Sequence, residues 1–143
     1  MTSIDFYILG ATKQKDRLDF VCRLVEKVYG EGRSVYLHTE NEKQAVWLDQ
    51  HLWKFKPDAF IPHNLVGDTE QPEVQVQIGW QDHPNHHNDV LVNLSGPIPT
   101  FFSRFDRVLE IVIQDEAVLE QTRKHYKFYK ERGYEVTHRD LRG

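Results

Sequence analysis

Hydrophobic and polar residues along the first half of the chain follow patterns typical of strands and helices in turn. Residues 4–9, IDFYIL, form an apolar and aromatic run that ends at Gly10 and predicts a buried first strand. A helix is predicted next, within 15–32, and Gly30 and Gly32 are expected to end it. Its apolar residues fall at helical spacing: Leu18, Val21, Cys22, Val25 and Val28.

A second strand and a second helix follow in the sequence. Residues 34–39, SVYLHT, read as a strand. Asn41 is a candidate helix N-cap, and Gln44 three residues later completes a capping-box pattern, so we expect a helix as far as about Trp53. This β-α-β-α order favours a layered α/β domain with a largely parallel sheet.

The second half of the chain is expected to add strands and one long helix. The segment 54–73 is rich in turn-forming residues. Residues 73–80, EVQVQIGW, alternate strictly, which predicts a strand with one solvent-exposed face near a sheet edge. The remaining expected elements are a strand over 90–95, a short helix within 101–114, a strand over about 109–113, a helix over about 116–132 between Asp115 and Gly133, and a strand in 134–138.

Length and composition indicate an ordinary folded domain. A chain of 143 residues with 39% hydrophobic and 12% aromatic residues can close a core as one domain, 1–143. The lone Cys22 excludes an internal disulfide framework and a zinc site built from several cysteines. Because we find neither a signal peptide nor an 18-residue apolar run, we expect a soluble cytoplasmic protein with no membrane contact.

The stretch QDHPNHHND, residues 81–89, is the candidate metal site. A metal bound here would make the protein a small metal-dependent α/β phosphoesterase or nucleotide hydrolase. Metal ligands are usually held rigidly by distant elements, whereas these residues stand among the turn formers Pro84, Asn85 and Asn88. We therefore favour a solvated hairpin loop and expect no metal. The candidate ligands are His83, His86 and His87, with Asp82 and Asp89.

Other catalytic patterns are missing from the sequence. ILGATKQK after the first strand lacks the G-x-x-x-x-G-K-[ST] spacing that holds phosphates, and neither G-x-S-x-G nor G-x-G-x-x-G occurs. Cys22 falls on the apolar face of its predicted helix, which suits a core residue better than a nucleophile. We expect no active site and no cofactor.

Charge is distributed unevenly, and the C-terminal helix carries the positive part. The net charge is −4, but 123–143 holds seven Lys/Arg against three Asp/Glu, and the other 122 residues hold 11 against 19. Arg123, Lys127 and Lys130 share one helix face beside Tyr126, an arrangement that suits an acidic peptide with an apolar anchor. A solvated basic face and a single-strand nucleic-acid patch are the alternatives. Lys124 and Phe128 lie further round the helix.

A second candidate surface is aromatic. A proline-punctuated loop carrying Trp53, Phe55, Phe60 and Ile61 is not expected to bury them all, and exposed aromatic clusters are typical of protein interfaces. The alternative is that all of them belong to the core, together with Trp47, Leu48 and Leu52.

Several segments, in order, resemble one family. They are the opening FYIL strand with its helix, NEKQAVWLDQHLW followed by AFIPHNLVGD, the alternating strand, and the helix end YKFYKERGY. Together they are similar to the chi subunit of bacterial DNA polymerase III holoenzyme over nearly the whole chain. The resemblance implies a three-layer α/β/α domain with a mixed sheet and no catalytic role. It implies two partners: the psi subunit, which links chi to the clamp loader, and the acidic, phenylalanine-ending C-terminal tail of single-stranded-DNA-binding protein.

The resemblance also assigns residues to each partner. The tail site would comprise Arg123, Tyr126, Lys127 and Lys130, with Val112 as a pocket wall. The family usually has another basic residue one turn before Arg123; here Leu119 or Glu120 stands there, and Lys124 is the candidate to compensate. The psi site would comprise Trp53, Phe60, Pro62 and His63. Direct nucleic-acid binding is not expected, a repair helicase is left open as a further partner, and the histidines of 81–89 are no family motif.

Overall fold

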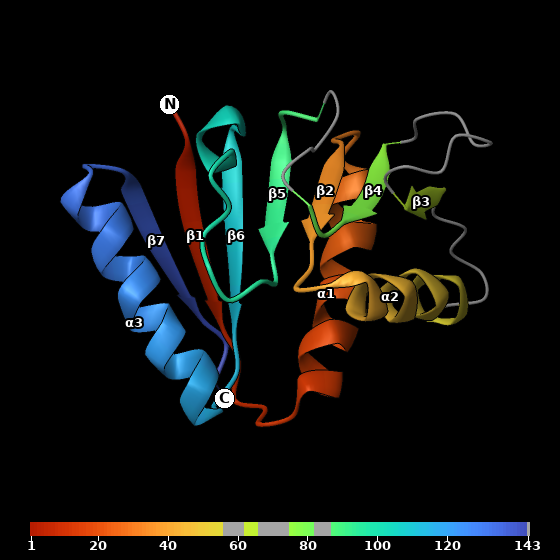
Figure 1. The fold of residues 1–143 in the computed structure, drawn as a ribbon, viewed down its shortest axis with the longest axis horizontal. Coiled ribbons are helices and arrows are strands. Elements are labelled where there is room, and N and C mark those ends of the chain that lie inside the picture. The colour runs from red at the N-terminus through yellow and green to blue at the C-terminus, as the bar shows by residue number, and fades with distance from the viewer. Residues whose placement is uncertain (56–61, 66–74, 82–86, 143) are drawn as a thin grey trace.

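A seven-stranded sheet runs through the protein, in the order β3-β4-β2-β5-β6-β1-β7 (Figure 1). The computed structural model describes residues 1–55, 62–65, 75–81 and 87–142. The strands are β1 Ser3–Ile8, β2 Val35–His38, β3 His63–Leu65, β4 Val76–Gly79, β5 Val90–Asn93, β6 Arg107–Val112 and β7 Glu135–Asp140. Every pair of neighbouring strands in these residues is parallel, so the largely parallel sheet is confirmed, and no antiparallel member of a mixed sheet occurs among them.

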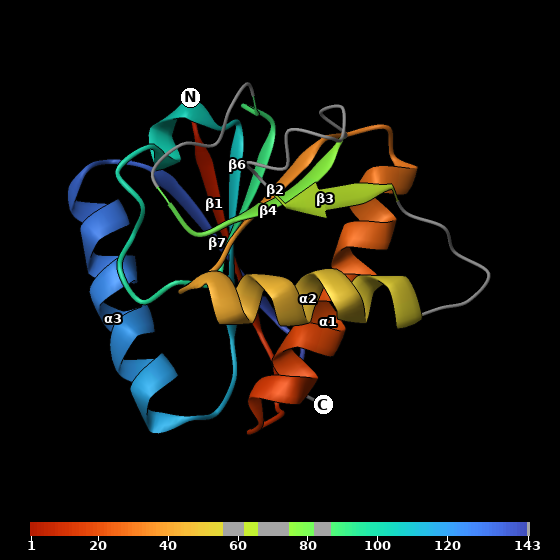
Figure 2. The same ribbon diagram turned by 45° about the vertical axis from the view of Figure 1, so that its right-hand side comes forward.

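Helices cover both faces of this sheet, which gives the three layers of an α/β/α fold (Figure 1, Figure 2). They are α1 Gln14–Gly30, α2 Glu42–Lys54, the short 3₁₀ helix η1 Phe102–Arg104 and α3 Glu116–Glu131. Successive strand residues point to opposite faces. On β6, Leu109 and Ile111 join the core under α1 and α2, while Val108 and Val112 join the core under α3 and η1. The α/β fold class is confirmed.

Local signals explain where the helices begin. The Asn41 side chain accepts the Gln44 backbone N–H at 2.9 Å, so Asn41 caps α2 as predicted. The Gln44 side chain accepts the Glu40 N–H at 2.9 Å, one residue before the N–H that a capping box uses. Asp115 caps α3 by accepting the Val118 N–H at 3.2 Å. Beyond α3, Gly133 takes φ +80°, a conformation that favours glycine.

The alternating strand is present and lies near a sheet edge as predicted, but its expected solvent-exposed face differs from the prediction. β4 lies second from the sheet edge, because β3 pairs with its outer side. The sequence pattern did not predict β3, which lies within the turn-rich segment 54–73. Gln77, expected on a solvent-exposed face, is buried and donates to the Asn64 side chain at 2.8 Å. The prediction of an exposed face is therefore wrong at this position, because a neighbouring amide supplies the partner that water would have given.

The connection from β4 to β5 also differs from its prediction. Both strands are parallel to β2 and lie on either side of it, so the chain between them is a crossover and not a hairpin. His87 is buried, and Asp89 accepts from Arg33 Nε at 2.9 Å and from the Ser34 N–H at 3.2 Å. The solvated-loop interpretation is wrong for these two residues. Asp82, His83 and His86 lie outside the described residues.

Among the described residues, no helix is both long and apolar enough to cross a membrane.

Candidate partner-binding surfaces

The outer face of α3 presents the predicted row of cations. Arg123, Lys127 and Lys130 are exposed, and Tyr126 is 38% exposed beside them. His125 and Tyr129 point the other way and are buried against the sheet. The helix is therefore amphipathic in the sense the sequence indicated, with a basic surface on one side and a packed surface on the other.

A small cavity of about 260 Å³ opens beside this row, between α3, β1, β6 and the C-terminal residues. Its walls are mostly apolar: Phe6, Ile8, Val112 and Leu119 lie there with the aliphatic part of Thr122. Arg123, Tyr126 and Gln114 complete the lining on the α3 and β6 sides. Three predicted residues, Val112, Arg123 and Tyr126, thus meet at one apolar cavity with a cation beside it.

The other predicted cations lie away from this cavity. Lys127 and Lys130 do not line it, and the Lys127 ammonium is 3.9 Å from the Glu131 carboxylate one turn along the exposed helix. Lys124 lies on the opposite flank of α3, with its ammonium 3.5 Å from Glu120. Exposed pairs of this kind contribute little to stability, so these lysines keep most of their charge available to a partner.

Seven of the ten residues that line the cavity were not predicted as site residues from the sequence, among them two from the C-terminal end of the chain. His138 on β7 stacks on Phe6, with ring centroids 5.6 Å apart and planes at 20°, and it also faces Tyr126 at 5.1 Å. Arg142 follows β7 and lines the same cavity. The final strand was expected, but its pairing beside β1, which sets Phe6 opposite His138, is a long-range property that the local pattern does not indicate.

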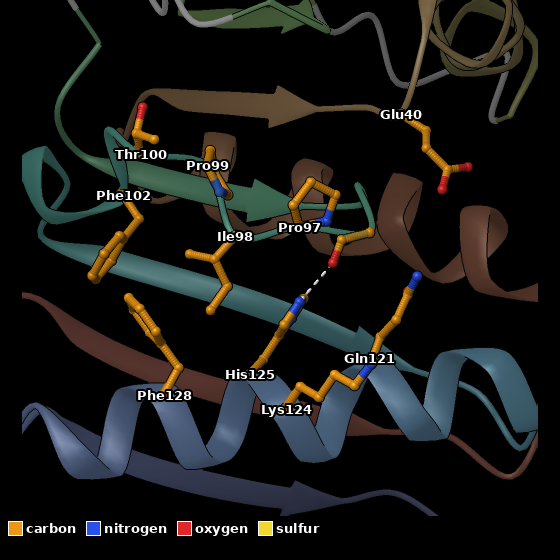
Figure 3. A pocket seen from close by; sticks show the side chains of 11 residues that line it. Glu40, Pro97, Ile98, Pro99, Thr100, Phe102, Gln121, Lys124, His125 and Phe128 are labelled. Atoms are coloured by element: carbon orange, nitrogen blue, oxygen red, sulfur yellow. Dashed lines mark hydrogen bonds between the residues drawn. The ribbon is translucent and has the colours of Figure 1, made fainter.

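A larger cavity of about 800 Å³ lies on the other flank of α3 (Figure 3). It sits at the carboxyl ends of β2 and β5, where the chain leaves adjacent strands toward opposite faces of the sheet. Phe102 and Phe128 face each other at one end, 5.7 Å apart, and Gln121 and Glu40 lie at the other. The full lining is Glu40, Gly96, Pro97, Ile98, Pro99, Thr100, Phe102, Gln121, Lys124, His125 and Phe128.

A buried polar cluster beneath this cavity fixes α3 on the sheet. Glu110 on β6 accepts from Tyr129 at 2.9 Å and from the Asn93 amide at 3.2 Å, and His125 Nδ1 lies 3.1 Å from it. His125 Nε2 lies 2.6 Å from the Gly96 carbonyl, as Figure 3 shows. Burial alone would lower the pKa of His125, but bonding and attraction to Glu110 outweigh it and raise that pKa.

The same buried environment also shifts the pKa values of two neighbouring side chains, Tyr129 and Arg17. Burial, with Glu110 close by, raises the pKa of Tyr129. Arg17 on α1 donates from Nε to the Ile111 carbonyl at 2.9 Å, and burial lowers its pKa. The contacts with Glu110 and the contact of Arg17 each join one secondary-structure element to another, and the His125–Gly96 contact joins α3 to the segment after β5, so the cluster holds α3, which carries Arg123, on the sheet.

Three of the four residues predicted for the psi surface lie among the residues that the structure describes. Trp53 at the end of α2 is 47% exposed, and its ring lies 4.2 Å from that of His63 on β3. His63 is buried, with Nε2 2.9 Å from the Asp49 carbonyl oxygen, and Pro62 beside it is half-buried. Phe60 lies outside the described residues. Trp53 and His63 are thus brought together as expected.

Comparison with known proteins decides the family. The profile described as DNA polymerase III chi subunit, HolC, matches residues 1–137. The chain belongs to the DNA polymerase III chi subunit family. The DNA polymerase III subunit chi of Pseudomonas aeruginosa is 40% identical over 134 residues, covering 94% of this chain and 93% of that protein. Those of Haemophilus influenzae and Escherichia coli are 32% and 29% identical and cover 92% and 95% of this chain, and 92% and 96% of their own lengths.

Chi family membership makes the chain an accessory subunit of a polymerase holoenzyme that acts in DNA replication. Among solved structures, the crystal structure of T4 UvsW superposes on 99% of the chi chain with a TM-score of 0.69. The sequence identity is 9%, and the chi chain spans 42% of that longer protein. The likeness shows a shared fold and nothing about activity.

Proposed function

We propose that the chain is a single-domain, non-catalytic adaptor of DNA polymerase III. It binds the acidic, phenylalanine-ending tail of single-stranded-DNA-binding protein on α3. It binds psi on the predicted psi surface around Trp53 and His63. The observation that carries the proposal is the meeting of Arg123 and an apolar cavity of about 260 Å³ on one exposed helix flank. This pairing matches the two chemistries that the tail combines in its last residues.

The terminal phenylalanine ring fills the apolar part of the cavity, against Val112, Leu119 and Ile8. Tyr126 and His138 supply aromatic edges and faces around the ring. The Arg123 guanidinium stands at the same cavity and takes a carboxylate of the tail in charge-assisted hydrogen bonds. Both contacts are made by the last residues of the ligand, which explains why a free peptide end suits this site.

The lysines act at longer range. Lys127 and Lys130 extend the positive surface from the cavity along α3 and attract the acidic residues that precede the tail's end. Lys124 faces the opposite flank, so it does not replace the missing family residue at the cavity itself. Tail binding is therefore expected to weaken as salt rises, since exposed charges are screened.

Psi occupies the surface around Trp53 and His63 and connects the chain to the clamp loader. Binding both partners tethers the polymerase machinery to coated lagging-strand DNA in the cytoplasm. Individually weak tail contacts suffice, because many tails along one strand raise the effective concentration.

The test is a calorimetric titration with an acidic peptide ending in Asp-Ile-Pro-Phe, at low and moderate salt. We expect salt-sensitive 1:1 binding, and Arg123→Ala should cost about 1.5–3 kcal/mol because it removes a charged hydrogen bond. Arg132→Ala is the matched control: its guanidinium stacks over Phe128, 3.8 Å from the ring centroid, and does not line the cavity. Equal affinities for Arg123→Ala and the unsubstituted chain would refute the site.

A further inference from the structure

A second guanidinium, that of Arg142, also borders the cavity. It lines the cavity together with Arg123, but it comes from the C-terminal residues and not from the helix. The family profile matches residues 1–137, so Arg142 lies beyond the matched part. Its side chain is 51% exposed, which leaves it accessible to a ligand in the cavity.

Four hydrogen bonds of Leu141 and Arg142 hold Arg142 beside the cavity. The Leu141 N–H donates to the Ile8 carbonyl at 2.8 Å, which continues the pairing of β7 with β1 as far as the residue before it. The Asp140 carboxylate accepts Arg142 Nε at 3.0 Å and Nη2 at 2.8 Å. It also accepts the Arg142 backbone N–H at 3.0 Å. In this structure these bonds orient the guanidinium at the edge of the cavity.

The orientation leaves one edge of the guanidinium open. A guanidinium has five N–H donors, arranged so that two edges can each hold a carboxylate. Asp140 takes the edge formed by Nε and Nη2. Among the described residues none accepts from Nη1, so the second edge is available to an incoming carboxylate.

We infer that Arg142 is a second carboxylate-binding residue of the tail site, and that Asp140 is its positioning residue. The inference rests on the proposed function and adds a specificity to it. A ligand whose aromatic side chain fills the cavity carries its terminal carboxylate at the cavity mouth, between Arg123 and Arg142. Two guanidiniums then hold one carboxylate, which makes the site selective for a free C-terminus over an amidated or internal phenylalanine.

The experiment measures the affinity of the Asp-Ile-Pro-Phe peptide in two forms, with a free terminal carboxylate and with a terminal amide. Arg142→Gln should weaken binding of the free acid about three- to tenfold, the range expected for a partly exposed charged contact. The same substitution should change binding of the amide by less than about twofold, because the carboxylate that Arg142 holds is gone.

Arg139→Gln is the matched control, since it removes the same charge from β7, three residues before Arg142. Arg139 lies 5.7 Å over the Tyr7 ring and does not line the cavity. Equal losses for the two variants, or equal losses for both peptides, would overturn the inference and leave only general attraction to the basic surface. In that case binding abolished by Arg123→Ala would still support the proposed function. Failure of the unsubstituted chain to bind either peptide would overturn both.

Discussion

His125 on α3 and Glu110 on β6 are paired in the interior, with Nδ1 3.1 Å from a carboxylate oxygen. The other imidazole nitrogen faces the Gly96 carbonyl at 2.6 Å. A carboxylate and a carbonyl oxygen both accept, and the pKa of His125 is raised, so this pair of contacts favours the imidazolium form with a hydrogen on each ring nitrogen. The pair is consequently a charged link between the helix that carries the tail site and the sheet.

This link predicts a pH dependence of stability. A pKa that is raised on folding contributes stability that is fully present below the unfolded-state value of 6.5 and is lost as pH rises through the folded value. The free energy of unfolding should therefore decline on going from about pH 6.5 toward alkaline pH. Arg17 on α1 opposes the shift, while Tyr129 on α3 bonds the far oxygen of Glu110.

Urea unfolding of the unsubstituted chain and of His125→Gln over this pH range measures the effect. The difference in free energy between the two should be greatest near pH 6 and should shrink as pH rises. Glu110→Gln should shrink the difference in the same way, since it removes the charge that stabilises the imidazolium. A difference that stays constant with pH would mean that the imidazole is neutral in the folded protein.

The capping contact of Asp115 leads to a second prediction, which concerns the stability of the first turn of α3. Its side chain accepts the Val118 N–H at 3.2 Å, and replacing an N-cap by alanine costs about 1 kcal/mol. Asp115→Ala should lower the free energy of unfolding by about that amount, while Asp115→Asn keeps an acceptor and should retain most of it. Hydrogen exchange of the first turn of α3 would show the local loosening, and unchanged protection in Asp115→Ala would contradict the capping role.

Trp53 and Trp47 offer a matched pair on α2 for the psi surface. Both are exposed, at 47% and 40%, but Trp53 lies against His63 and Trp47 stacks on His51 at 4.5 Å. Trp53→Ala should weaken psi binding by about 2 kcal/mol or more, as for an interface hot spot, whereas Trp47→Ala should have little effect. Titration with purified psi measures this. Loss of tail binding in Trp53→Ala, with psi binding kept, would mean that the two surfaces are exchanged.

Sequence patterns located the helices well because their signals are local. The capping residues Asn41 and Asp115 stand within three residues of the N–H groups that they accept. β3 has three residues and no alternation of its own, so it becomes a strand only through pairing with β4. The order of strands in a sheet likewise depends on contacts between distant segments. The local pattern therefore predicted a hairpin between β4 and β5, where the structure has a crossover.

In the candidate site, too, local signals identified some residues, and long-range strand pairing brought in others that the sequence pattern could not indicate. Arg123 and Tyr126 share a helix face, and the resemblance added Val112, so these three could be grouped from the sequence. Arg142 could not be, because only the parallel pairing of β7 with β1 carries the C-terminal residues to the cavity. Lys124 is one residue from Arg123, yet the 100° turn between adjacent helical residues places it at the other cavity.

The position of β1 between β6 and β7 has a consequence for folding during synthesis. The first strand made is completed by the last two, with Ser3 opposite Arg107 on one side and Glu135 on the other. A chain emerging from the ribosome therefore carries an apolar β1 without its neighbours until β6 and then β7 have been translated. Such distant pairing slows folding and leaves both edges of β1 unpaired, and thus exposed to wrong strand pairing, until β6 and β7 dock on it.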